Sequence, residues 1–163
     1  MGPKIEARPI TAADEALIGA WLRDPEVHAW FGDAASAEAA VRLARTSDAA
    51  LARIITADGA PIGYGQAIDG ALMGDAAAAE PGVWHVDAFI GDAPLRGRGL
   101  GASVLDAIAR EVLGSTLALA VSMLVPVRHE RVVRAAETAG FRWSAVREDP
   151  SLGRCWLMVR RRP

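Results

Sequence analysis

The chain has 163 residues and a mass of 17.1 kDa, the size of one ordinary domain with a sizeable core. Its 52% hydrophobic and 23% charged residues exclude a disordered chain, and charges interrupt every apolar stretch before the roughly 18 residues that span a bilayer. A formal net charge of -2 and a pI near 5.9 argue against a nucleic-acid binder, which needs a basic surface. We therefore expect one soluble domain, residues 1–163, that acts on a small molecule and binds neither nucleic acid nor a membrane.

The rare residue types exclude further classes of protein. Lys4 is the only lysine, so neither a P-loop lysine nor a Schiff-base lysine can sit inside the fold. Cys155 is the only cysteine, and the histidines lack the spacing of zinc ligands (His28, His85 and His129), so we expect no metal cofactor. Residues 1–10 lack the apolar core of a secretory signal, and one cysteine forms no intrachain disulfide, so we expect a cytoplasmic protein.

The first half of the chain predicts helices and a hairpin. Thr11-Ala-Ala-Asp14 resembles a capping box, and Asp58-Gly59 is typical of a hairpin turn. Ser36 and Glu38 are expected to start a helix that carries Val41 and Leu43. The expected elements are a strand at 5–10, a helix from 11 to about 23, a short turn or helix at 26–31, a helix from about 36, and strands at 51–56 and 61–68.

The second half of the chain predicts a strand, a crossover helix and a second, parallel strand. Residues 83–90 alternate as a strand does, with His85, Asp87 and Phe89 on one face and Trp84, Val86, Ala88 and Ile90 on the other. The expected elements are a loop at 75–80, a helix at 102–113 that stops at Gly114, a buried parallel strand at 117–125, a helix at 129–139 closed by Gly140-Phe141, and strands at 142–148 and 154–161.

A glycine-rich segment, Pro94-Leu-Arg-Gly-Arg-Gly-Leu-Gly101, lies between the strand and the crossover helix. Its glycines let the main chain approach a phosphate, the helix start offers backbone N–H groups, and Arg96 and Arg98 add charged donors. The segment therefore predicts a phosphate site made of Leu95, Arg96, Gly97, Arg98, Gly99, Leu100 and Gly101. The alternatives are a glycine-rich turn without a ligand and a dinucleotide fingerprint; the latter fails because residues 91–96 intervene and residues 117–125 contain no acid.

These residues resemble a known family. Arg96-x-x-Gly99-x-Gly101 after a strand and before a helix is similar to the acyl-CoA pyrophosphate loop of the GNAT superfamily of N-acyltransferases. The likeness extends to segments similar to the branch that holds aminoglycoside 6′-N-acetyltransferases and siderophore-lysine acyltransferases (8–11, 21–27, 30–32, 86–91 and 131–141). The resemblance implies a single α/β (α+β) domain with a mixed, mostly antiparallel sheet, helices on both faces and a central βαβ unit that binds acyl-CoA.

The resemblance also implies site residues. The N–H groups around Phe89, Ile90 and Gly91 would bind the pantetheine arm and the acyl carbonyl of acetyl-CoA. Asp87 matches an Asp that anchors the substrate amine or acts as the base, and His85 on the same face would relay a proton; either residue could instead be structural. Three aromatic residues, Trp30, Phe31 and Trp84, would wall the acceptor cleft or pack in the core.

The likeness is incomplete at positions where the family often has catalytic or substrate-binding groups. The family's Tyr, which protonates the thiolate, is replaced by Ala136, and the branch's Asp by Leu124, so His129 or water would have to deliver the proton. Tyr64 is expected to serve packing. We further expect Trp21, Trp143, Trp156 and Cys155 in the core, and a solvated tail at 160–162.

The implied function is acetyl-CoA-dependent N-acetylation of a small amine by a monomer or homodimer. An aminoglycoside-type polyamine is the first candidate acceptor, a siderophore hydroxylamine or lysine side chain the second, and a protein amino terminus the third. The alternative class is a catalytically weakened module that binds CoA or sequesters a drug.

Overall fold

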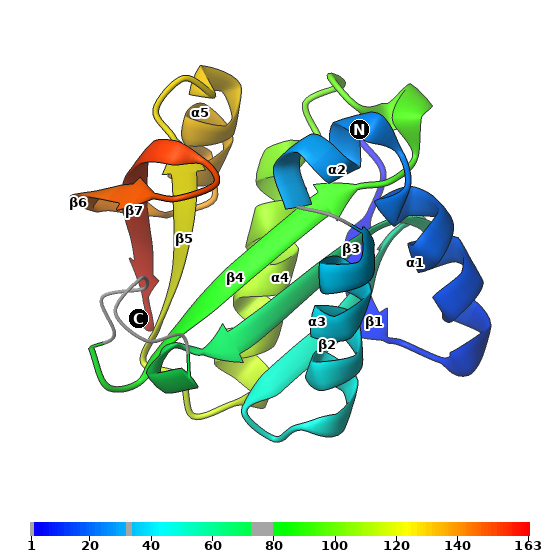
Figure 1. Ribbon diagram of the computed structural model, residues 1–163, viewed down its shortest axis with the longest axis horizontal. Helices are drawn as coiled ribbons and strands as arrows, with labels where there is room; N and C mark the ends of the chain where they lie inside the picture. The colour runs from blue at the N-terminus through cyan, green and yellow to red at the C-terminus, as the bar shows by residue number, and fades with distance from the viewer. Residues whose placement is uncertain (1, 32–33, 73–79) are drawn as a thin grey trace.

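The computed structural model describes residues 2–31, 34–72 and 80–163 (Figure 1). Most of the loop expected at 75–80 lies outside these residues. A seven-stranded sheet has the order β1-β2-β3-β4-β5-β7-β6, and β4 and β5 form its one parallel pair among the described residues. The strands are β1 (Ile5–Pro9), β2 (Ala50–Ala57), β3 (Ala60–Asp69), β4 (Val83–Ile90), β5 (Ala120–Pro126), β6 (Arg142–Asp149) and β7 (Gly153–Arg161).

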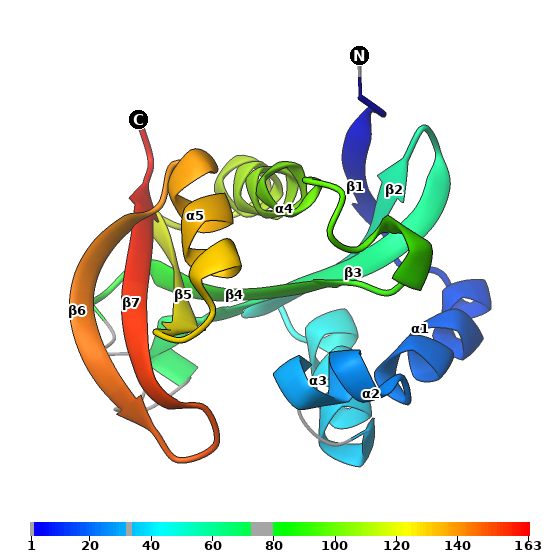
Figure 2. The ribbon, with the colours of Figure 1, turned by 90° about the horizontal axis from the view of Figure 1, so that it is seen from above.

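Two groups of helices cover the two faces of the sheet (Figure 2). One face carries α1 (Glu15–Leu22), α2 (Pro25–Phe31) and α3 (Ala34–Thr46), and the other carries α4 (Gly101–Ser115) and α5 (Glu130–Thr138). Short 3-10 turns at Ala12–Asp14, Gly70–Leu72 and Ala93–Leu95 complete the elements. This single mixed, mostly antiparallel domain confirms the predicted fold class.

Local sequence signals produce the turns and helix ends that were expected. Asp58 (φ 48°) and Gly59 (φ 86°) both adopt the left-handed conformation that a tight hairpin turn requires. The capping box is present: the Thr11 N–H donates to the Asp14 carboxylate at 2.8 Å, and Arg8 also donates to it, so the pKa of Asp14 lies well below its usual range. At the end of α5, Gly140 (φ 91°) and Phe141 close the helix by donating to the carbonyls of Glu137 and Ala136.

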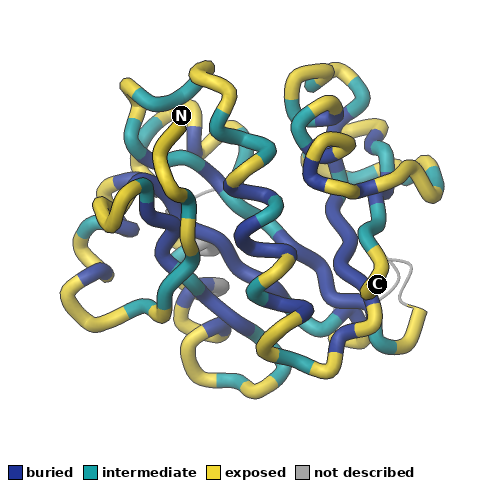
Figure 3. Tube along the Cα trace, turned by 180° about the vertical axis from the view of Figure 1, so that it is seen from behind, coloured by how far each residue is buried: buried dark blue, intermediate teal, exposed yellow. Residues whose placement is uncertain are grey.

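The core has two main parts, one on each side of the sheet. Figure 3 shows buried residues along the central strands, with exposed residues at the turns. Ile108, Val112, Val121, Phe141 and Met158 pack between the sheet and the α4–α5 layer. On the other side, Ile18, Leu22, Ile54, Tyr64 and Phe89 pack under α1–α3. The full burial of Tyr64 and Cys155 confirms that both residues serve packing.

The structure corrects two expected element boundaries. Gly114 does not end its helix, because α4 continues through Ser115 and closes at Thr116, whose N–H and hydroxyl both donate to the Val112 carbonyl. Strand β5 begins at Ala120 rather than at 117, since residues 117–119 form the connection from α4 and leave Leu117 96% exposed.

One tryptophan expected in the core is not there. Trp143 lies 58% exposed on the edge strand β6, where its ring stacks on that of Trp156, with 4.9 Å between the ring centroids. In the tail at 160–162, Arg161 and Arg162 are exposed as expected, but Arg160 donates to Asp106 and to the Ala139 carbonyl, and Arg162 donates to the Ala118 carbonyl. Arg160 therefore ties β7 to α4 and to the end of α5.

Candidate active site

The sheet splits between β4 and β5. These strands pair only where Val83–His85 lie beside Ala120–Ser122. Beyond His85, β4 remains paired with β3 as far as Ile90, while β5 continues beside β7, so the two halves of the sheet diverge (Figure 1). The divergence leaves the backbone of β4 unpaired on one edge at the centre of the molecule.

A groove of about 660 Å³ lies at the wide end of this split. Its lining comes from α2, the end of β4, the glycine-rich segment, α4, β5 and α5. The lining includes Trp30, Phe89, Ile90, Arg96, Gly97, Gly99, Leu100 and Gly101 from the expected site, together with the unexpected Ala88, Met123, Arg131, Val132, Arg134 and Ala135. The fold therefore brings most of the expected cofactor-binding residues to one groove.

The glycine-rich segment has the geometry of an anion site. Gly97 (φ 73°) and Gly99 (φ 79°) are left-handed, and the space around a Cβ at position 99 is empty of protein atoms within 4 Å. The N-cap of α4 is Leu100, whose side chain has no acceptor for the N–H groups of the first turn. These groups and the positive end of the helix dipole thus remain available to a phosphate.

Arg96 lines the groove, but its guanidinium is held by protein groups. Its Nε donates to the Ile90 carbonyl at 2.8 Å and its Nη2 to the Gly91 carbonyl at 3.0 Å. The guanidinium also pairs with Asp24 and Glu26, each at 3.3 Å. Arg96 is therefore a clamp that ties the loop to the end of β4 and to the start of α2. Leu95 is half-buried beside it, and Arg98 is exposed and donates to the Pro94 carbonyl.

Two arginines that the sequence analysis missed supply positive charge to the groove. Arg131 and Arg134 on α5 line it, and an Arg131 nitrogen lies 3.9 Å from the position of a Cβ on Gly97. Their spacing of three residues places them on one helix face, which was the only signal for them in the sequence. The groove can therefore bind a pyrophosphate between the start of α4 and the face of α5.

Of the three backbone donors expected on β4, only Ile90 faces the split, and Ala88 takes the place of Phe89 and Gly91. The Gly91 N–H is occupied, because it donates to the Ile62 carbonyl at 2.8 Å. Neighbouring residues of a strand direct their backbone groups to opposite edges, so Phe89 also faces β3, whereas Ala88 and Ile90 face the split. Accordingly, the carbonyls of Ala88 and Ile90 accept hydrogen bonds from Trp30 and Arg96. The N–H groups of Ala88 and Ile90 are thus the ones directed at the groove.

Asp87 and His85 lie together on the face of β4 that is covered by α1–α3. The Asp87 side chain is 36% exposed, His85 is buried, and Nε2 of His85 lies 3.5 Å from Oδ2 of Asp87. Loss of surrounding water raises the pKa of the Asp87 carboxyl, the charge of Asp149 raises it further, and His85 acts in the opposite direction. Asp87 is therefore a carboxylate with increased affinity for a proton, next to the split.

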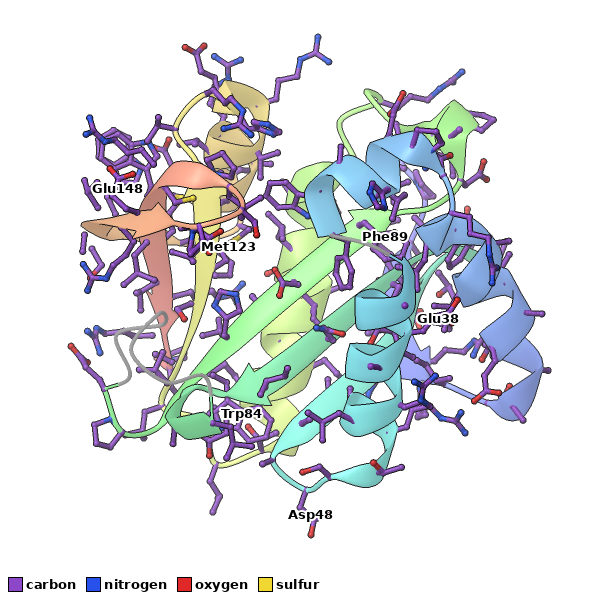
Figure 4. All side chains as sticks on the ribbon, in the orientation of Figure 1. Glu38, Asp48, Trp84, Phe89, Met123 and Glu148 are labelled. Carbon is purple, nitrogen blue, oxygen red and sulfur yellow. The ribbon has the colours of Figure 1, made fainter. Side chains whose placement is uncertain are left out.

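Three aromatic residues were predicted to line the acceptor cleft, and two of them lie near the face of the sheet that carries Asp87. Trp30 donates from Nε1 to the Ala88 carbonyl at 3.2 Å, and Phe31 packs edge-on against Phe89. The expectation for Trp84 is wrong: its side chain is 8% exposed and packs on the opposite face, in the core under α4. Figure 4 shows Trp84 at the far end of β4 from Phe89.

His129 caps the start of α5 and contacts Trp30, with 5.7 Å between the ring centroids. The pair bridges the two halves of the split sheet. Partial burial and the nearby Arg128 lower the pKa of His129, which favours its neutral form and weakens it as a proton donor. Ala136 is fully buried in the core and does not line the groove, so a tyrosine there would overpack the α4–α5 layer.

The described residues form neither a metal-binding cluster nor a membrane-spanning helix. No three or more of their His, Cys, Asp and Glu side chains gather as a metal-binding group. None of their helices is long and apolar enough to cross a membrane.

Three features lie together: the sheet splits between its parallel strands, a helix start suited to an anion lies beside the split, and free strand N–H groups face it. This combination is typical of a transferase that takes an acyl group from a phosphate-containing thioester. Residues 11–148 match the family described as acetyltransferase (GNAT) domain. The chain belongs to this family and is an acyl-CoA-dependent N-acetyltransferase. The family resemblance stated from the sequence is confirmed.

Solved structures share this fold over nearly the whole chain. Aminoglycoside acetyltransferase AAC(6')-Ib in complex with coenzyme A is 24% identical, with a TM-score of 0.82 over 98% of this chain and 95% of that one. An aminoglycoside N(6')acetyltransferase from Legionella pneumophila is 16% identical, with a TM-score of 0.75 over 99% and 94%. A spermidine N-acetyltransferase chimera from Vibrio cholerae and hSSAT is 12% identical, with a TM-score of 0.73 over 96% and 94%. No curated protein matches the chain.

Proposed function

We propose that this enzyme transfers the acetyl group of acetyl-CoA directly to an amine of a small cationic acceptor, with an aminoglycoside as the first candidate. The observation that carries the proposal is the position of Asp87, a partly exposed carboxylate beside the split that shares a face of β4 with Phe89, on the side of the sheet under α1–α3. A cationic amine can approach this carboxylate from the α1–α3 side while acetyl-CoA occupies the groove. The structural likeness to aminoglycoside acetyltransferases adds support.

The residues fit each requirement of direct acyl transfer. The first turn of α4, with Arg131 and Arg134, would hold the pyrophosphate, and the N–H groups of Ala88 and Ile90 would stabilise the oxyanion at the acyl carbonyl. Asp87 would bind the ammonium group and remove one proton, after which the amine nitrogen attacks the acyl carbon. When the C–S bond breaks, the second proton of the attacking nitrogen can pass to the thiolate through water, because the groove provides no tyrosine for this step.

We further propose a cytoplasmic location, where acetyl-CoA is available, and a monomer or homodimer. Acetylation removes the positive charge of an aminoglycoside amine, and such an activity would increase the resistance of a cell to these antibiotics.

A screen for thiol release from acetyl-CoA tests the acceptor class. The panel should contain aminoglycosides, polyamines, hydroxylamines, lysine derivatives and peptides with free amino termini, each also titrated by calorimetry. We expect release to depend on an aminoglycoside. Release with hydroxylamines, lysine or peptides alone would assign the site to those acceptors, whereas tight aminoglycoside binding without release would indicate a sequestering module, the alternative that the absence of Tyr at 136 and Asp at 124 favours.

A further inference from the structure

Two buried polar atoms lie at the apex of the split without hydrogen-bond partners among the described residues. They are Nδ1 of His85 on β4 and Oγ of Ser122 on β5. His85 is 7% exposed and Ser122 is 1% exposed, so bulk water does not replace the missing partners. Such unpaired groups lower the stability of the folded state unless a side-chain rotation gives them a hydrogen-bond partner. They are otherwise kept where they take part in the chemistry of a site.

The strand register makes these residues direct neighbours. His85 and Ser122 are paired in the last rung of the β4–β5 ladder before the strands diverge. Paired residues of a parallel ladder project from the same face, and the alternate β5 residues Val121, Met123 and Val125 belong to the core on the α4–α5 side. Ser122 therefore shares with His85 and Asp87 the face that is covered by α1–α3.

The chemistry of the two groups is complementary. A serine hydroxyl rotates freely about its C–O bond and can accept a hydrogen bond from a ring N–H. If Nδ1 of His85 carries the proton, Nε2 of the neutral ring has a free lone pair, and Nε2 is the atom that faces Asp87 at 3.5 Å.

We propose that Ser122 is a positioning residue, which accepts a hydrogen bond from Nδ1–H of His85 and directs Nε2 toward Asp87 as the acceptor of the proton that Asp87 removes from the substrate amine. This inference rests on the proposed function. It adds Ser122 to the site and makes His85 the residue that accepts the proton from Asp87.

The proton balance of the reaction requires such an acceptor. An ammonium acceptor and acetyl-CoA yield an amide, free CoA thiol and one released proton. Asp87 takes a proton from the ammonium group and passes it to Nε2, which leaves Asp87 charged and the ring an imidazolium with two N–H groups. The carboxylate of Asp87 and the hydroxyl of Ser122 then accept one hydrogen bond each from this ring, and the proton returns to solvent through the exposed side of Asp87 after the product leaves.

The other groups around Asp87 do not compete for this role. Asp149 on β6 raises the proton affinity of Asp87 by its charge but is itself an acid. On β3, the Tyr64 hydroxyl donates to Gln66, which pairs with Asp87 across the strands, and burial raises the pKa of Tyr64 far above its usual value. His85 is the one base that the structure places in contact with Asp87 among the described residues.

The first arm of the test is nitrogen NMR of the holoenzyme with CoA, using ¹⁵N-labelled histidine and the signals lost in His85→Gln for assignment. We expect the neutral His85 ring to carry its proton on Nδ1 in the parent and in Ser122→Thr, which keeps the hydroxyl, and to lose this preference in Ser122→Ala. A ring with its proton on Nε2 in the parent, or identical spectra in the parent and Ser122→Ala, would overturn the proposal. This arm needs no acceptor, so its outcome is independent of the proposed function.

The second arm is the pH dependence of kcat for the best acceptor from the screen. We expect Ser122→Ala to reduce the plateau kcat by roughly tenfold and to change the position of the acid limb, since the tautomer that presents the Nε2 lone pair to Asp87 is no longer favoured. Ser122→Thr should restore both, and Thr56→Val, which removes a buried hydroxyl on β2 away from the split, should change neither. An unchanged profile in a folded Ser122→Ala with normal CoA affinity would overturn the relay, and an absence of any acceptor would count against the proposed function.

Discussion

Gly99 determines whether a phosphate can approach the start of α4. Its left-handed backbone and the empty space around a Cβ mean that a side chain there would meet the ligand rather than the protein. We expect Gly99→Asp to weaken CoA binding by at least a hundredfold, because its charge repels the pyrophosphate. The matched control is Gly99→Asn, which has the same shape, tolerates a positive φ and lacks the charge. Calorimetry should show a smaller loss for Asn, and equal binding of CoA by Gly99→Asp would exclude this loop as the phosphate site.

Asp87 combines substrate binding with proton removal in the proposed reaction. Asp87→Asn keeps the size of the side chain and deletes its charge, so we expect kcat to fall by roughly two orders of magnitude if Asp87 is the base. CoA affinity should stay unchanged because the glycine-rich segment is separate. If Asp87 only anchors the cation, the acceptor KM should rise instead while kcat is retained. Steady-state kinetics that match the parent in both constants would assign Asp87 a structural role.

The raised pKa of Asp87 also predicts an effect on stability. A carboxyl group whose folded-state pKa lies above its unfolded value contributes most when it is protonated, and this contribution is lost as pH rises through the folded-state pKa. Asp87→Asn should therefore increase Tm at neutral pH, and the difference should vanish below about pH 4, where the unfolded chain is also protonated. Thermal unfolding at several pH values measures this, and a decrease of Tm at pH 7 would contradict it.

At the scale of elements, the Arg96 clamp joins the glycine-rich segment to α2, which carries Trp30 to the Ala88 carbonyl. Arg96→Ala should weaken CoA binding and raise the acceptor KM together, and should reduce the free energy of unfolding by about 2 kcal/mol, because several charge-assisted hydrogen bonds are lost. Arg98→Ala is the control, since Arg98 is exposed and bonds only within its own loop. Equal effects of the two substitutions on CoA affinity would show that loop charge, rather than the clamp, matters.

The positions of the helices and strands along the chain were largely predictable from the sequence. Which elements pack or pair with one another was not. Strand β4 occupies the predicted residues 83–90 with the predicted alternation, because adjacent residues of a strand dictate its two faces. The register of β4 with β3 decides which edge of β4 stays unpaired. The free N–H groups therefore belong to Ala88 and Ile90 and not to Gly91. Likewise, the exposure of Trp143 follows from the position of β6 at the sheet edge, which the local sequence does not encode.

At the scale of the whole molecule, Arg8 of β1 and Asp14 ahead of α1 form an ion pair, with Asp14 buried and Arg8 partly exposed, that anchors the helix layer to the sheet edge. The pKa of Asp14 is depressed in the folded state, so its contribution to stability is present above its unfolded value and is lost as pH falls through the folded-state pKa. We expect Asp14→Asn to cost about 2 kcal/mol at neutral pH, with a difference that narrows below about pH 4. Denaturant unfolding tests this, with Asp58→Asn at the exposed hairpin turn as a control; equal losses at pH 7 and pH 2.5 would contradict it.

The sequence by itself determined the class of this protein. Turns, helix ends and the glycine-rich segment depend on residues that are neighbours in the chain, so the Arg-Gly-Arg-Gly-Leu-Gly segment predicted a phosphate site, and its resemblance to the GNAT superfamily implied an acyl-CoA-dependent transferase. The tertiary structure alone decided which side chains meet. Arg96 clamps Asp24, which is 72 residues away, Arg131 and Arg134 supply the charge expected from Arg96, and Ser122 lies beside His85. These partners come from separate elements, and only the packing of the sheet against its helices brings them within bonding distance.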